Sequence, residues 1–267
     1  MRPDLLVTAR NARFQQWQAL LSNRTKRHRT GEFLVQGVRP ITMAVRHGWD
    51  VRALLYDADR RASRWAADLL DTTDAELIAL APQLLAELTD KDSDAAEIVA
   101  VVATRADDLA RIELPEGALV VVLDRPSSPG NLGAVVRSAD AFGAAGVIVA
   151  GHAADIYDPK AVRASTGSLF ALPVVRTGAP DLVIDWARSH GLAMVGLDES
   201  GDADIAEHDL TVPTLLAVGN EATGLSSAWR EACERMVRIP IGGGASSLNA
   251  AAAAGIALYE AARQRRS

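Results

Sequence analysis

The stretch ALVVVLDRPSSPGNLGAVVR, residues 118–137, decides the fold class of this chain. Its first six residues, Ala118 to Leu123, form a continuous apolar run that is rich in β-branched valine. Such a run is typical of a strand that is buried on both faces of a parallel sheet. A tight loop with two prolines and a glycine follows, and Asn131 to Phe142 then has the spacing of a helix. This strand–loop–helix unit predicts an α/β fold.

The same alternation of apolar runs and helical periods continues to the C-terminus. We expect strands at Gly146–Ala150, Leu192–Leu197, Leu215–Val218 and Val237–Ile239. We expect helices at Pro159–Ser165, Leu182–His190, Ser226–Glu234 and Leu248–Arg263. Strands that alternate with helices in this way predict a sheet of parallel type.

A second, smaller α/β unit is predicted in the N-terminal part of the chain. Its strands are expected at Glu32–Gly37, Val51–Tyr56, Glu76–Ala79 and Glu97–Ala103. Its helices are expected at Arg13–Leu21, Val38–His47, Arg61–Leu70 and Ala81–Leu88. The segment Thr104–Glu116 is charged and contains a proline, so it is interpreted as a linker. We therefore predict two domains, residues 1–106 and residues 117–267.

The composition excludes several classes of protein. The 267 residues are 49% hydrophobic and 23% charged, which is the usual balance of a soluble globular chain. No apolar stretch reaches the roughly 18–20 residues of a membrane span, and Met1–Arg13 has no apolar core of signal-peptide length. The single cysteine, Cys233, excludes a disulfide framework, and the five histidines are scattered. We expect a cytoplasmic protein without a metal ion.

The net charge of −6 hides a strong asymmetry along the chain. Residues 1–52 hold ten Arg or Lys against three acidic residues, a balance of +7, whereas residues 53–110 hold five against thirteen, a balance of −8. Binding of a polyanion depends on local charge, so a basic arm over residues 1–30 is compatible with nucleic acid. The charge alone fits a solvated basic tail equally well.

Two further polar segments with glycines follow predicted strands. GNEATG occupies residues 219–224, and IPIGGGASSLN occupies residues 239–249 at the start of the last helix. Ligands of open parallel sheets bind at the carboxyl ends of the strands, so these segments and the loop before Asn131 are expected to lie close together. Each segment alone also fits an ordinary loop or helix cap. Neither common nucleotide-binding fingerprint is present.

Taken together, these segments resemble a known family. NLGAVVR, GNEATG and IPIGGGASSLN match the three motifs of the SpoU (TrmH-type) RNA 2′-O-ribose methyltransferases of the SPOUT class, in the same order and with similar spacing. RTKRHRTGEFLVQGVRPI, residues 24–41, resembles the N-terminal RNA-binding domain of that family. The chain departs from the family pattern at Gln36, where glutamate is common, and at Ile241, where methionine is common.

The resemblance implies a fold and a cofactor. The C-terminal domain is expected to be a trefoil-knotted SPOUT domain with a parallel sheet, and the smaller N-terminal α/β domain is expected to bind the RNA substrate. The cofactor implied is S-adenosyl-L-methionine, bent in the knot and held largely by backbone groups. Carried over to this sequence, its contacts fall on Leu197, Gly219, Asn220, Ile239, Ile241 and Leu248. A homodimer with the active site across its interface is also implied.

The resemblance further implies methylation of a ribose 2′-hydroxyl of RNA, with 23S rRNA as the substrate and resistance to a ribosome-targeting antibiotic as a role. The catalytic residues implied are Asn131, Arg137, Glu221, Ser247 and Asn249. The RNA contacts expected are Arg24, Lys26, Arg27, Arg29 and Arg163. A non-catalytic RNA-binding module and an enzyme with another nucleotide-like ligand are the alternatives, and binding of S-adenosylmethionine separates them from the methyltransferase.

Overall fold

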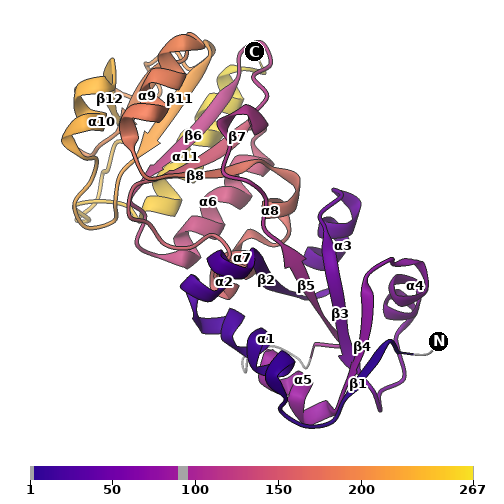
Figure 1. The fold of residues 1–267 in the computed structure, drawn as a ribbon. Helices are drawn as coiled ribbons and strands as arrows, with labels where there is room; N and C mark the ends of the chain where they lie inside the picture. Colours follow the sequence, from indigo (N-terminus) through magenta and orange to yellow (C-terminus); the bar gives the residue numbers. More distant parts are fainter. Residues whose placement is uncertain (1–2, 90–95, 267) are drawn as a thin grey trace. The chain divides into compact units, whose positions relative to one another are not determined.

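The computed structural model describes residues 3–89 and 96–266 (Figure 1). The chain divides into two compact units. Unit 1 comprises Met1–Arg105 and Tyr157–Ala171, and unit 2 comprises Ala106–Ile156 and Leu172–Ser267. The assignment of residues 157–171 to unit 1 was not predicted, because in the sequence they lie between two strands of unit 2.

Unit 1 contains a five-stranded mixed sheet with the strand order β1-β4-β3-β5-β2. The strands are β1 (Leu5–Val7), β2 (Glu32–Gln36), β3 (Val51–Asp57), β4 (Glu76–Leu80) and β5 (Ile98–Ala103). The β1–β4 and β3–β4 pairs are parallel, whereas β5 is antiparallel to both β3 and β2. Four of these strands were predicted, and the three-residue β1 was missed because it is too short to show a periodic pattern.

The helices of unit 1 include five from the N-terminal part and two from residues 157–171. They are α1 (Ala12–Ser22), α2 (Arg24–Thr30), α3 (Val38–Arg46), α4 (Arg64–Thr72), α5 (Pro82–Leu88), α7 (Pro159–Ser165) and α8 (Ser168–Ala171). The basic arm predicted over residues 1–30 is folded in its described part, where it contains β1, α1 and α2, and its most basic stretch forms the helix α2. Asn23 begins it, because its side chain accepts the backbone N–H of Lys26 at 2.9 Å.

A buried aromatic cluster explains why residues 157–171 belong to unit 1. The ring centroids of Phe33 and Tyr157 lie 4.6 Å apart, and those of Trp49 and Phe170 lie 5.1 Å apart in an edge-to-face arrangement. The indole N–H of Trp49 donates to the Phe170 carbonyl at 3.0 Å. This cluster joins the early strand β2 to a segment more than a hundred residues later in the chain.

Unit 2 contains a seven-stranded sheet in which every strand pair is parallel, with the order β10-β12-β9-β11-β6-β7-β8. The strands are β6 (Leu119–Asp124), β7 (Gly146–Ala150), β8 (Val174–Thr177), β9 (Ala193–Leu197), β10 (Ala203–Asp204), β11 (Thr214–Val218) and β12 (Arg235–Arg238). The predicted parallel α/β sheet is therefore confirmed, and the short edge strands β8 and β10 were missed. The trefoil knot stays a prediction.

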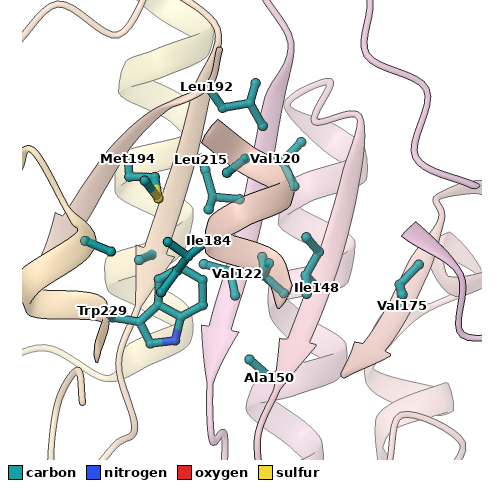
Figure 2. Close-up of a cluster of buried hydrophobic side chains, with 14 of the residues drawn as sticks. Val120, Val122, Ile148, Ala150, Val175, Ile184, Leu192, Met194, Leu215 and Trp229 are labelled. Carbon is teal, nitrogen blue, oxygen red and sulfur yellow. The ribbon is translucent and has the colours of Figure 1, made fainter. Parts of the chain in front are cut away.

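The helices of unit 2 cover the sheet and enclose its core. They are α6 (Pro129–Ala141), α9 (Pro180–Ser189), α10 (Ser227–Ala232) and α11 (Ala250–Gln264), with a short 3₁₀ helix η1 (Leu109–Arg111). The helices α6 and α11 pack against each other (Figure 1). Figure 2 shows one side of the core, where Val120, Ile148 and Leu215 from neighbouring strands face Ile184 and Trp229.

The segment that was predicted as a linker is largely part of unit 2. Ile112 is buried in the core of unit 2, and an added Cβ at Gly146 would lie only 2.9 Å from its side chain. The carboxylate of Asp107 accepts the backbone N–H and the guanidinium of Arg176. The linker prediction is therefore wrong for residues 106–116. No helix among the described residues is long and apolar enough to cross a membrane.

Candidate cofactor and catalytic site

A cavity of about 310 Å³ lies in unit 2 at the carboxyl ends of the adjacent strands β9, β11 and β12. This is the edge at which parallel sheets bind ligands. All six side chains or backbone positions predicted to contact a cofactor line it: Leu197, Gly219, Asn220, Ile239, Ile241 and Leu248. The predicted catalytic residues Glu221 and Ser247 line it as well, whereas Asn131, Arg137 and Asn249 do not.

The GNEATG loop forms one wall of this cavity and is held by its own backbone. Asn220 and Gly224 exchange two backbone hydrogen bonds of 3.1 and 3.0 Å. A Cβ added at Gly219 would lie 2.4 Å from the carbonyl carbon of Gly224, so only glycine fits at this position. The Asn220 side chain is engaged as well, because its amide donates to the Arg125 carbonyl at 2.7 Å and its oxygen accepts the N–H of Ala222.

Glu221 connects the three sequence motifs. Its carboxylate accepts the backbone N–H and the hydroxyl of Ser127, at 2.9 and 2.8 Å. It also accepts the side-chain amide of Asn131 at 3.0 Å, and the Asn131 oxygen in turn accepts the amide of Asn249 at 3.2 Å. The structure therefore brings Asn131, Glu221 and Asn249 together, as the position of their loops at one sheet edge predicts.

The same hydrogen bonds fix the charge of Glu221. Partial burial alone would raise the pKa of this carboxyl group. The donors from Ser127 and Asn131 outweigh burial and lower the pKa to about 2. Glu221 is therefore ionised at neutral pH, and it acts as an acceptor that holds the loop before α6 rather than as a proton donor.

Arg137 lies within the helix α6, whereas Asn249 lies at the N-terminus of the helix α11. Arg137 lies on α6, with an exposed side chain that makes no hydrogen bond or ion pair within the described part of the chain. Asn249 caps α11, because its side-chain oxygen accepts the backbone N–H groups of Ala251 and Ala252. A permanently charged guanidinium on an exposed helix face suits a phosphate or a developing oxyanion.

Sequence reasoning missed an ion pair at the same cavity. Asp198 and Arg230 both line it, and the guanidinium of Arg230 donates to the Asp198 carboxylate. Partial burial would raise the pKa of Asp198, but hydrogen bonds from Ser200 and Arg230 lower it below its usual range. The sequence did indicate Asp198 as a candidate, because it directly follows the apolar run of β9. Gly219 follows the apolar run of β11 in the same way.

The structure corrects one of the predicted RNA contacts. Arg27 is only 2% exposed, and its guanidinium donates to the Leu20 carbonyl at 2.7 Å and pairs with Asp158 at 3.6 Å. Arg27 is therefore a structural residue that joins α1, α2 and the start of α7, and it is not available to a phosphate. The side chain of Arg29 on α2 is exposed, and those of Arg24 and Lys26 are partly exposed. Arg163 on α7 is also exposed and belongs to the same unit.

Over residues 3–89 and 96–266, no group of three His, Cys, Asp or Glu side chains is arranged to hold a metal ion. Burial raises the pKa of the Cys233 thiol to about 12, and the nearby carboxylate of Glu234 adds to the effect. The thiol is therefore uncharged and unreactive at neutral pH.

Comparison with known proteins identifies both parts of the chain. A model of the SpoU L30e-like domain matches residues 11–100, and a model of the SpoU rRNA methylase family matches residues 118–259. The chain is 60% identical to the 23S rRNA (uridine(2479)-2′-O)-methyltransferase of Streptomyces viridochromogenes, over 97% of this chain and 92% of the relative.

Solved structures agree with these matches over nearly the whole chain. The crystal structure of the SpoU methyltransferase AviRb from Streptomyces viridochromogenes in complex with AdoMet is similar with a TM-score of 0.94 and 60% identity, covering 97% of this chain and 99% of the other. An AdoMet-bound rRNA methyltransferase from Sinorhizobium meliloti has a TM-score of 0.86 at 31% identity, covering 97% and 98%.

Proposed function

Because the chain belongs to the SpoU rRNA methylase family, we propose that it transfers a methyl group from S-adenosylmethionine (AdoMet) to a ribose 2′-hydroxyl of 23S rRNA. The resemblance inferred from the three motifs is thereby confirmed at the level of the family. The observation that carries the proposal is the hydrogen-bonded chain from Asn249 through Asn131 and Glu221 to Ser127. A protein that only bound RNA would not need to join three separate loops beside a cavity.

The residues around the cavity of unit 2 suit AdoMet. Its volume of about 310 Å³ lies within the roughly 300–1,000 Å³ of small-molecule sites. Apolar side chains line one part, and the backbone of the Gly219–Gly224 loop lines another, which suits a flat base together with polar groups. A Cβ at Gly219 would disturb the loop that forms this wall. When bound, AdoMet supplies a methyl group that its own sulfonium charge has already activated.

Arg137 is the residue that we place at the reacting oxygen. A guanidinium stays protonated at ordinary pH, so it serves poorly as a base. It instead holds the phosphate next to the target ribose and stabilises the negative charge that develops on the 2′-oxygen. The 2′-oxygen forms a bond to the methyl carbon as the bond from carbon to sulfur breaks. The hydroxyl proton passes to a phosphate oxygen or to water.

The other predicted catalytic residues act by positioning. Glu221 accepts from Ser127 and Asn131 and so fixes the loop from which α6 begins. Asn249 holds Asn131 from the start of α11, and Ser247 lies at the cavity two residues earlier. These contacts keep the motif that carries Arg137 in one arrangement relative to the cofactor cavity.

We propose a homodimer on the basis of the exposed face of α11. Ile256 and Tyr259 are 42% and 53% exposed and lie three residues apart on that helix, so they share one face. Exposed apolar groups that lie together on a helix favour contact with a partner. In a dimer that uses this face, Arg137 of one protomer is available to complete a site with its partner. Light scattering of Tyr259→Asp against the unchanged protein tests this arrangement.

We propose that the enzyme acts in the cytoplasm, because ribosomal RNA is its proposed substrate. The partly exposed Arg24 and Lys26 and the exposed Arg29 and Arg163 suit the phosphates of that RNA. Protection of the ribosome from an antibiotic stays a prediction. It is tested by comparing the drug sensitivity of cells that carry the active protein with that of cells that carry Arg137→Ala.

One experiment tests the function as a whole. The protein is incubated with labelled AdoMet and 23S rRNA, and the 2′-O-methylated riboses are mapped. Transfer to a single ribose is expected. If AdoMet fails to bind to the folded protein, the proposed function is wrong, and the chain is a non-catalytic RNA-binding module or an enzyme with another nucleotide-like ligand. If AdoMet binds and no ribose of 23S rRNA is methylated, the substrate is another RNA.

A further inference from the structure

A second cavity, of about 530 Å³, lies entirely within unit 1 and has no part in the proposed methyl transfer. It is formed where β2 ends and α3 begins, by the start of β5, by Arg60 and the first turn of α4, and by α7. Residues from both sequence segments of unit 1 therefore build it. Its volume lies within the roughly 300–1,000 Å³ that small-molecule sites occupy.

The walls of this cavity are mainly apolar and include one aromatic side chain. Leu34, Pro40 and Val162 line it, and Val38 lines it while remaining 55% exposed. Trp65 is the aromatic residue, and its indole N–H donates to the Thr42 hydroxyl at 3.0 Å. This bond fixes the edge of the indole ring and so limits the orientations of the flat ring at the cavity. A concave, mainly apolar surface with one aromatic ring and a few polar groups is typical of ligand sites.

The charged groups at this cavity are mostly cationic. Arg39, Arg60 and Arg163 line it, and Glu97 is the one carboxylate among the lining residues that the structure describes. The Glu97 carboxylate accepts the backbone N–H of Ser63, and the Arg39 guanidinium donates through Nε to the Thr166 carbonyl at 2.9 Å, which leaves its two terminal amino groups for a further acceptor. Gln36, where the family commonly has glutamate, also lines the cavity and adds no negative charge. The balance of charge therefore favours an anionic occupant.

We propose that this cavity takes one unpaired base of the RNA substrate, stacked on Trp65, with the flanking phosphates held by Arg39, Arg60 and Arg163. Proteins recognise RNA mostly through unpaired bases that leave the helix and stack on aromatic rings, and arginine binds phosphate well. The inference rests on the proposed function, since it concerns the same RNA. It adds a second recognition point to the methylated ribose, whose site is in unit 2.

The first test compares Trp65→Ala with the unchanged protein. Binding of fluorescent oligouridylate and oligoadenylate single strands, and of the duplex that the two form, is measured by anisotropy. Single-strand binding is expected to weaken by about 5- to 150-fold, the range for loss of one base stacked on an aromatic ring. Trp65→Phe retains a ring and is expected to bind close to normally. Duplex binding should be unchanged, because its bases are not available to the cavity.

A matched pair of exposed valines tests the same idea without touching buried groups. Val38 lines the cavity, whereas Val45 lies on the same helix, is 46% exposed and does not line it. Val38→Glu places a carboxylate in the cavity and is expected to weaken single-strand binding at least as much as Trp65→Ala. Val45→Glu adds the same charge elsewhere on α3 and is expected to have little effect. This pair decides the question even if Trp65→Ala does not fold.

The outcomes separate this inference from the proposed function. If Val38→Glu and Val45→Glu bind single strands equally well, or if Trp65→Ala weakens duplex and single strand alike, the cavity takes no base. The unchanged protein can still methylate 23S rRNA in that case. If the unchanged protein binds AdoMet and single-stranded RNA through Trp65 yet methylates no ribose, the proposed function fails and the base site stands.

Discussion

The two cavities of this protein are built in different ways. The cavity of unit 2 lies at the carboxyl ends of parallel strands, and the backbone of a loop with fixed residue types forms one of its walls. The cavity of unit 1 is lined by side chains that come from β2, α3, α4, α7 and the start of β5. The difference teaches that a site made by backbone geometry leaves a compact motif in the sequence. A site made by side chains from distant elements leaves none.

The largest effect is expected at Gly219, because the loop backbone leaves no room for a side chain at this position. Gly219→Ala would place a Cβ 2.4 Å from the Gly224 carbonyl carbon, so the loop must shift, at a cost of about 1–3 kcal/mol or more. Calorimetry should then detect no AdoMet binding. Gly242→Ala is the matched control, because nothing lies within 4 Å of its added Cβ. Normal AdoMet binding by Gly219→Ala would show that the loop does not form the cofactor site.

Substitution of Arg137 tests the methyl transfer that is proposed to take place beside this cavity. Arg137→Ala should reduce single-turnover methyl transfer by about 10²–10³, the usual loss for one charge-stabilising donor. Arg137→Lys should remain slow, because lysine lacks the planar guanidinium. AdoMet binding should survive in both variants, since Arg137 does not line the cavity. The exposed Arg188 on α9 provides a control, and Arg188→Ala should react at the normal rate. A normal rate for Arg137→Ala would remove this residue from the mechanism.

In unit 1, the prediction compares the free energies of unfolding after replacement of two arginines on the helix α2. Arg27→Ala should lower the free energy of unfolding by about 1.5–3 kcal/mol, because a buried charged donor is lost from the Leu20 carbonyl and from Asp158. Arg29→Ala, at an exposed position, should change it by less than about 0.5 kcal/mol. Urea denaturation measures both values. Equal stability of the two variants would return Arg27 to the set of candidate RNA contacts.

The smallest effect is expected for Glu221 and depends on pH. Its pKa of about 2 in the folded protein lies below the ordinary value of 4.5, so the ionised carboxylate stabilises the folded state above about pH 4.5. That contribution is lost as the pH falls towards 2. Glu221→Gln should be less stable than the unchanged protein by about 1 kcal/mol at pH 7, because solvent screens this partly exposed group. Thermal unfolding should show the difference shrinking in acid, and a difference that is independent of pH would contradict the assignment.

The sequence predicts the centre of each sheet better than its edges. The runs of β6 and β7 are apolar for five or six residues, and such runs are recognisable because both faces of the strand are buried. The strands β1, β8 and β10 have two to four residues, too few for any period to appear. The knot was implied by the family resemblance alone, since local patterns carry no information about how the chain threads.

The same limit applies to the site residues. The three motifs predicted that Asn131, Glu221 and Asn249 meet, because each follows a strand that ends at the same edge. Arg27 could not be placed, because its neighbours Lys26 and Arg29 have the same chemistry and only the tertiary contacts with the Leu20 carbonyl and Asp158 show which one is buried. The cavity around Trp65 required residues from five elements, β2, β5, α3, α4 and α7, to be brought together, and no single stretch of sequence indicates it.

The division of unit 1 between two sequence segments has a consequence for synthesis on the ribosome. The chain leaves unit 1 after Arg105, returns at Tyr157 and leaves again after Ala171. When the first segment has emerged, Phe33 and Trp49 still lack Tyr157 and Phe170, their later aromatic partners. The nascent N-terminal unit therefore carries an uncovered aromatic surface until translation has passed Ala171, and any fragment that stops at Arg105 keeps that surface permanently.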